Sequence, residues 1–187
     1  MRESLFSWRA LRRHSVWILA ASATGAVAAL FRYLDDWSIQ FSHWLATVSP
    51  WIQPAMLFFG MILICQLRDR FFRGTDGTGI PQAIAALKIE DGPARDHVLS
   101  WRILVGKGLL LAIGLFAGMT IGREGPSVHA GACFMYLSNR WGNFQSWLVQ
   151  RGLILAGGAA GIAAAFNTPI AGVVFALEEI GRSFEKN

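Results

Sequence analysis

Long apolar runs, separated by charged or glycine-rich segments, set the pattern of this chain. The clearest runs cover residues 15–34, 50–66, 103–121 and 152–180. A helix needs about 20 apolar residues to cross a bilayer, and the first three runs approach or reach that length. The fourth run is too long and too interrupted by glycine and proline for one span. The pattern therefore predicts three or four full membrane spans and at least two broken or half-length helices.

Charged residues at the ends of the first two runs predict their orientation. Residues 1–14 are basic and include Arg12 and Arg13, and the second run ends beside Arg68 and Arg70. Because Lys and Arg are enriched in cytoplasmic loops, both ends are expected in the cytoplasm, and residues 1–14 would form a cytoplasmic N-terminal segment. A cleaved signal peptide is the competing interpretation. A retained helix is favoured, since the apolar run continues past the small residues that would suit cleavage.

The composition agrees with a membrane protein. Hydrophobic residues make up 53% of the chain and charged residues 16%, whereas soluble domains are about 25% charged. The net charge of +5 does not indicate nucleic-acid binding, because the arginines lie at the ends of apolar runs and act as topology signals. The four histidines and two cysteines show no metal-ligand or catalytic spacing. We therefore expect an integral membrane protein that is not an enzyme and holds no metal or other cofactor.

Three motifs rich in glycine or proline interrupt the apolar pattern. The first, residues 74–81, ends at Pro81, which suits the first turn of a short helix up to residue 87. The second, residues 122–126, precedes a helix expected over residues 127–137. The third, residues 167–169, breaks the last run because the residue before a proline is disfavoured in a helix. A glycine-rich surface turn remains an alternative explanation of the first motif.

Broken helices at membrane depth predict a binding site, because non-helical backbone is tolerated there only where protein buries it or it lines a cavity. Each helix start carries about half a positive elementary charge, so converging starts form an anion site without a full charge. Thr78 adds a hydroxyl donor. Glu124 requires compensation or a function, since an ionisable side chain in the membrane costs at least about 2.5 kcal/mol. An ion pair with Arg123 or Lys107 is the structural alternative.

Other patterns predict packing and loops. Gly114, Gly118 and Gly122 recur every fourth residue, and on one helix face they would let a neighbouring helix approach closely. A second face of small residues lies within residues 157–161. Residues 88–97 mix charges and are expected to form a cytoplasmic loop. Lys107 either snorkels to the cytoplasmic boundary or faces a buried anion path.

Taken together, the motifs resemble the CLC family of chloride channels and chloride/proton exchangers. The matching segments are Gly77-Thr78-Gly79-Ile80-Pro81, Gly122-Arg123-Glu124-Gly125-Pro126 and residues 161–179, and their order and spacing match as well. The resemblance extends from the first span to Glu179. It implies an all-α integral membrane fold, a multi-span bundle with broken and half-length helices similar to the first inverted half of the CLC fold.

The resemblance also implies roles for single residues. Glu124 would compete with the transported anion and free its site on protonation, while Glu179 would be the internal proton-transfer residue. The anion would be bound by Gly77, Thr78, Gly79, Ile80, Pro81, Gly122, Arg123, Gly125 and Pro126. The expected function is chloride/proton antiport gated by Glu124. A passive chloride channel and a truncated, non-transporting membrane subunit are the alternatives. For Glu178 and Glu179 the alternative is a helix end wetted by the cytoplasm.

The chain departs from the family pattern in side chains and in length. Thr78 stands where serine is more common in chloride-selective relatives, and Gln82 where an acidic residue is common. Chloride is still expected because the hydroxyl is kept, with nitrate, bromide and fluoride as alternatives. Residues 15–187 correspond to a partial transmembrane domain without the second half, which in the family supplies a tyrosine and a Gly-x-Phe-x-Pro segment to the anion site. Transport is therefore expected of a longer chain or a complex, a homodimer if full length, in the cell (inner) membrane.

Overall fold

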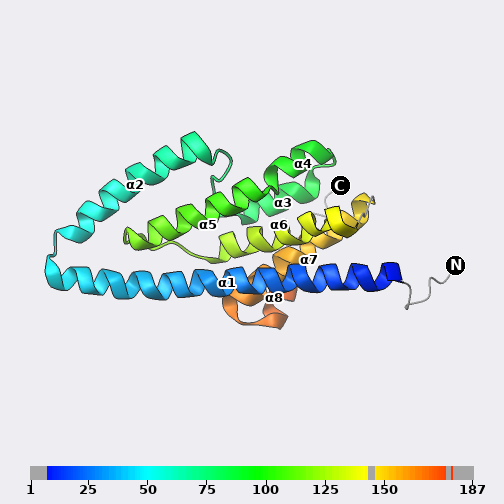
Figure 1. The fold of residues 1–187 in the computed structure, drawn as a ribbon, viewed down its shortest axis with the longest axis horizontal. Helices are drawn as coiled ribbons and strands as arrows, with labels where there is room; N and C mark the ends of the chain where they lie inside the picture. Colours follow the sequence, from blue (N-terminus) through cyan, green and yellow to red (C-terminus); the bar gives the residue numbers. More distant parts are fainter. Residues whose placement is uncertain (1–7, 143–145, 176–177, 179–187) are drawn as a thin grey trace.

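The computed structural model describes residues 8–142, 146–175 and 178, and this part of the chain is helical without strands (Figure 1). The helices are α1 (Trp8–Val48), α2 (Ile52–Phe71), α3 (Ile80–Lys88), α4 (Gly92–Val98), α5 (Trp101–Phe116), α6 (Glu124–Gly142), α7 (Trp147–Phe166) and α8 (Pro169–Phe175). The predicted all-α fold is confirmed.

Among the described residues, four segments are long and apolar enough to span a membrane: His14–Val48, Ile52–Phe71, Gly92–Phe116 and Trp147–Phe166. The short helices α3 and α8, of 9 and 7 residues, lie outside these segments, whereas α4, of 7 residues, forms the beginning of the segment Gly92–Phe116. The described part of the protein is therefore an all-α membrane bundle that combines full spans with half-length helices.

The first helix is longer than its apolar run. α1 does not stop at Asp35 and Asp36 but continues to Val48, for 41 residues in all. Neither glycine nor proline occurs between Asp36 and Val48, so no residue there breaks the helix. At 1.5 Å per residue, α1 is about 60 Å long, roughly twice the thickness of the hydrocarbon core. It must therefore be tilted in the bilayer or extend beyond it.

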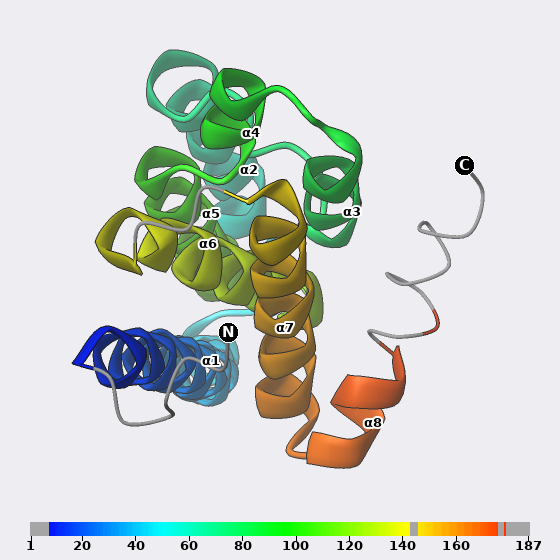
Figure 2. The ribbon, with the colours of Figure 1, turned by 90° about the vertical axis from the view of Figure 1, so that its right-hand side faces the viewer.

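The centre of the bundle is the contact between α6 and α7, which cross next to α1 (Figure 2). Glycines let the two backbones touch: a Cβ on Gly157 would lie 2.6 Å from the carbonyl carbon of Gly131. A Cβ on Gly161 would lie 2.7 Å from the carbonyl carbon of Ser127. The predicted small face within residues 157–161 is thus confirmed, and it holds α7 against the helix that starts at Glu124.

The predicted glycine face on residues 103–121 is wrong. Helix α5 ends at Phe116, and Gly118 adopts a φ of 91°, a conformation that turns the chain out of the helix. Gly118 and Gly122 therefore lie in the linker after α5 and share no helix face with Gly114. Gly114 instead leaves room for this returning linker, since its Cβ would lie 2.5 Å from Cδ1 of Ile121.

Residues 88–97, predicted as a loop, include most of the helix α4 and a buried cation. Arg95 is only 5% exposed and donates hydrogen bonds to Tyr136 Oη at 3.3 Å, Ile89 O at 3.1 Å and Gln150 Oε1 at 2.7 Å. Its guanidinium also lies 4.0 Å from the centre of the Trp147 ring. Because these partners belong to α6, α7 and the chain after α3, Arg95 ties the three elements together.

The predicted break at residues 167–169 is confirmed. Asn167 follows the last residue of α7 in the left-handed conformation, with a φ of 55°, and α8 begins at Pro169. A hydrogen bond of 3.1 Å from Thr168 N to Ala163 O closes the end of α7. Gly172 lets α8 fold back onto α7, because its Cβ would lie 2.7 Å from Ala163 Cβ.

Candidate functional site

The first two glycine-rich motifs meet in space. Gly77 and Gly79 have φ values of 78° and 120°, which side chains other than glycine rarely adopt. Across from them, a Cβ on Gly125 would lie 2.5 Å from the carbonyl oxygen of Thr78 and 2.8 Å from its Cβ. The starts of α3 and α6 are therefore in backbone contact, and the contact requires glycine on both sides.

A cavity of about 580 Å³ opens beside this contact. Its lining includes seven of the residues predicted to bind the anion or gate it, namely Gly77, Thr78, Ile80, Gly122, Glu124, Gly125 and Pro126. Gly79 lies behind the lining against Gly125, and Pro81 lies in the first turn of α3. The remaining residue predicted to bind the anion, Arg123, pairs with Asp35 of α1.

The two helix starts give this cavity a positive field. Helix α3 begins at Ile80 and α6 at Glu124, and both residues line the cavity. The first N–H groups of a helix have no partner within it and carry the positive end of the helix dipole. The arrangement suits a small anion, because oriented N–H groups stabilise negative charge without a fixed counter-ion.

Glu124 forms no ion pair within the described part of the chain, and its two candidate partners are engaged elsewhere. Nη1 of Arg123 lies 3.0 Å from Oδ2 of Asp35, while Nζ of Lys107 donates to Gly77 O at 2.8 Å. The ion-pair alternative for Glu124 is therefore wrong. The carboxylate instead lies over Gly122, where a Cβ would be 2.5 Å from Oε2 of Glu124.

Lys107 lines the same cavity and is 6% exposed, so it does not snorkel to a boundary. Its ammonium group holds the carbonyl of Gly77 and thereby fixes the first motif. The sequence left open whether Lys107 snorkels to the cytoplasmic boundary or faces a buried path, and the structure fits the buried position.

Two further charged residues line the cavity and were not predicted as part of the site. They are Arg68, at the end of α2, and Asp76, which belongs to the first motif. Nη1 of Arg68 lies 3.3 Å from Oδ1 of Asp76, and its Nη2 lies 2.8 Å from Oδ1 of Asp69. In the sequence, Arg68 stands only as an arginine after an apolar run, which is also typical of a topology signal. Gln82, the departure noted in the first motif, donates a hydrogen bond to Asp76 O and closes the loop over Gly77.

The second predicted proton residue, Glu179, lies outside the described residues, and its neighbour Glu178 is exposed. The proton-transfer role of Glu179 therefore stays a prediction. In the described part of the chain no cluster of His, Cys, Asp and Glu is arranged to hold a metal ion.

Known proteins are similar to this chain over the motifs that line the cavity. A family model described as "Voltage gated chloride channel" matches residues 60–187, more than half of the chain and all of the cavity's motifs. The chain belongs to the voltage-gated chloride channel family. No solved structure matches it significantly.

Several curated proteins of this family are similar to the chain. The H(+)/Cl(-) exchange transporter ClcA of Cronobacter sakazakii is 34% identical over 181 residues, which are 91% of this chain and 38% of that protein. Chloride channel protein CLC-d of Arabidopsis thaliana is 36% identical over 143 residues, 69% of this chain and 17% of that protein. The anion/proton exchange transporter GEF1 of Saccharomyces cerevisiae is 33% identical over 140 residues, 73% of this chain and 18% of that protein.

The chain thus spans well under half the length of these relatives. Their names describe transporters and channels, not enzymes, and this agrees with the expectation from the sequence. Membership of the family and the four apolar spans among the described residues indicate a membrane protein.

Proposed function

We propose that this chain is part of a membrane protein that exchanges chloride for protons, with Glu124 as the gate. The observation that carries the proposal is a Glu124 that has no ion-pair partner among the described residues and lies in a cavity formed by two helix starts. A carboxylate there competes with an anion for the same positive field, and protonation removes the competitor. Two of the similar proteins are named as proton-coupled exchangers, which supports the same reaction for this chain.

The predicted binding residues have distinct roles in this proposal. The main-chain N–H groups at Gly79–Ile80 and at Gly125 would face the anion, with the Thr78 hydroxyl as a further donor. Pro81 and Pro126 would fix the first turn of their helices, because proline presets the φ that a helix start needs. Glu179 would carry protons between Glu124 and the cytoplasm.

The test uses the native product that contains residues 1–187, purified and placed in liposomes, with chloride efflux and proton uptake recorded together. Glu124→Gln is expected to preserve chloride flux and abolish proton uptake driven by chloride. Glu179→Ala should also stop proton uptake, while Asp36→Asn, which removes an exposed carboxylate of α1, should behave as wild type. Coupled exchange in Glu124→Gln would refute the gating role, and chloride flux without protons in the wild type would indicate the passive channel.

The same proposal includes an assembly and an orientation. We propose a homodimer in the cell (inner) membrane with the N-terminus in the cytoplasm, supported by the basic residues 9–14 and 68–73 beside the first two spans. The mass of the native product in its own membranes discriminates between the alternatives. A mass well above 20.5 kDa supports an exchanger of which this chain is a part. A mass of 20.5 kDa supports the short membrane subunit or a complex with a partner chain.

A further inference from the structure

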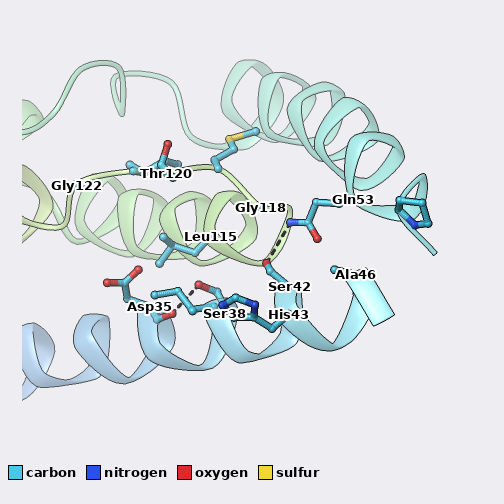
Figure 3. A pocket seen from close by; sticks show the side chains of 14 residues that line it. Asp35, Ser38, Ser42, His43, Ala46, Gln53, Leu115, Gly118, Thr120 and Gly122 are labelled. Carbon is cyan, nitrogen blue, oxygen red and sulfur yellow. Dashed lines mark hydrogen bonds between the residues drawn. The ribbon is translucent and has the colours of Figure 1, made fainter. Parts of the chain in front are cut away.

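A second cavity lies next to the Glu124 cavity, on the other side of the linker between α5 and α6. It has a volume of about 600 Å³ and is lined by α1, the start of α2 and the linker. Figure 3 shows Asp35 and Ser38 toward one end of this cavity and Gln53 toward the other. Met119, Ile121 and Gly122 line both cavities. The linker is therefore the wall between the Glu124 cavity and a second cavity on the α1 side.

Arg123 follows directly after this wall, and its two ends are held by different elements. Its guanidinium Nη1 lies 3.0 Å from Oδ2 of Asp35, with the two side chains 27% and 31% exposed. Its carbonyl oxygen accepts a hydrogen bond of 3.0 Å from Ser127 N, at the first turn of α6. The backbone of Arg123 thus belongs to the helix start that carries Glu124, while its charge is fixed to α1.

The other charged groups around Glu124 are engaged as well. Among the described residues that line its cavity, Lys107 holds Gly77 O, and Arg68 pairs with Asp69 and Asp76. Histidines are more remote: His43 lines the second cavity, and His129, buried in α6, contacts the carbonyl oxygen of Val98 at 3.2 Å. The cation nearest in sequence to Glu124 is Arg123, and Arg123 forms its ion pair with Asp35.

We propose that Asp35 is a positioning residue that keeps the Arg123 cation away from Glu124. The inference rests on the proposed gating role of Glu124. An opposite charge within about 4–6 Å of a carboxyl group favours its ionised form. A gate that must become neutral to leave the anion site would then open only in stronger acid. By holding Arg123, Asp35 leaves Glu124 free to take up a proton.

The direct test measures chloride flux against pH in liposomes for Asp35→Asn in the native product. Without its carboxylate partner, Arg123 is free to turn to Glu124, so half-maximal flux should move about one unit toward acid pH, as expected for a nearby opposite charge. Asp35→Glu keeps the ion pair and should titrate as wild type. Asp36→Asn is the matched control, because it removes the neighbouring carboxylate, which is exposed and makes no ion pair within the described residues. Equal curves for Asp35→Asn and Asp36→Asn would overturn the inference.

Double variants separate positioning from a merely structural role. If Asp35 acts by holding Arg123, then Asp35→Asn should cause no further acid shift in an Arg123→Gln background. An acid shift of the same size in that background would overturn the inference. Asp35→Ser provides a second neutral replacement where the amount of folded Asp35→Asn is reduced. Glu124→Gln in the same assay tests the proposed function separately. If chloride flux in that variant were still pH-dependent and coupled to protons, the gating role of Glu124 would be refuted independently of the role of Asp35.

Discussion

Replacing Gly125 with alanine tests whether the contact between the two helix starts builds the site. The added Cβ would lie 2.5 Å from the carbonyl oxygen of Thr78 and 2.8 Å from both its carbonyl carbon and its Cβ. These atoms belong to a backbone segment that Lys107 and Gln82 hold in place. Since non-bonded carbon atoms pack best at about 3.5–4.0 Å, the two motifs would have to separate by about 1 Å.

Two opposing terms decide the stability of Gly125→Ala. Overpacking a tight contact costs about 1–3 kcal/mol, whereas alanine in place of glycine favours a helix by up to about 1 kcal/mol. The net loss of stability should therefore be about 0–3 kcal/mol. Moving the start of α6 away from the anion should also remove up to about 1 kcal/mol of dipole stabilisation. That energy corresponds to roughly a five-fold weaker anion affinity.

Gly152→Ala is the matched control for this variant. Gly152 also lies near the start of a long helix, α7, but a Cβ there would meet no atom within 4 Å. The stability of Gly152→Ala should therefore reflect only the higher helix propensity of alanine. The assay is thermal unfolding in detergent, followed by chloride titration of the purified native product. If Gly125→Ala were as stable and bound chloride as tightly as Gly152→Ala, the contact would not be needed for the site.

Two other substitutions probe the gate and the fold. Gly122→Ala adds a Cβ only 2.5 Å from Oε2 of Glu124, which is the end of a flexible side chain. We expect the pH dependence of chloride flux to change, while the free energy of unfolding stays within about 0.5 kcal/mol of the wild-type value. An unchanged pH profile would show that the carboxylate does not need its place over Gly122. Arg95→Met keeps the volume but loses the buried hydrogen bonds, so chemical unfolding should show a loss of roughly 2–3 kcal/mol. Arg102→Met, which removes one exposed hydrogen bond, should cost under about 1 kcal/mol; equal losses would contradict the role of Arg95.

The helix breaks could be predicted from the sequence because they are local. Pro81 and Pro169 restrict their own φ and the conformation of the residue before them, and the structure starts α3 and α8 at Ile80 and at Pro169. The meeting of two of these breaks in one cavity could not be read from periodicity. The dipole argument gave only the general expectation of converging helix starts, and the family resemblance named the residues. The backbone contact at Gly125 now gives that expectation a geometric basis.

Where the sequence failed, tertiary contacts determined the outcome. Glycines spaced four apart indicate a packing face only if the helix continues through them, and α5 stops before Gly118. The real close contact uses Gly131 and Gly157, which are far apart in the chain. Residues 88–97 look like a loop because they are charged, but Arg95 finds its partners on α6 and α7 and becomes part of the core.

The pairing of charges is where local sequence is least informative. Arg123 is adjacent to Glu124 and Lys107 lies on the preceding helix, so sequence alone makes both of them candidate partners of the carboxylate. The actual partner of Arg123 is Asp35, 88 residues earlier, and that of Lys107 is a backbone carbonyl. A charged residue beside a gate is thus an ion-pair partner or a spectator depending on a residue that only the fold brings near. Under the proposed gating role of Glu124, loss of Asp35 would let Arg123 pair with Glu124 and would make this carboxylate harder to protonate.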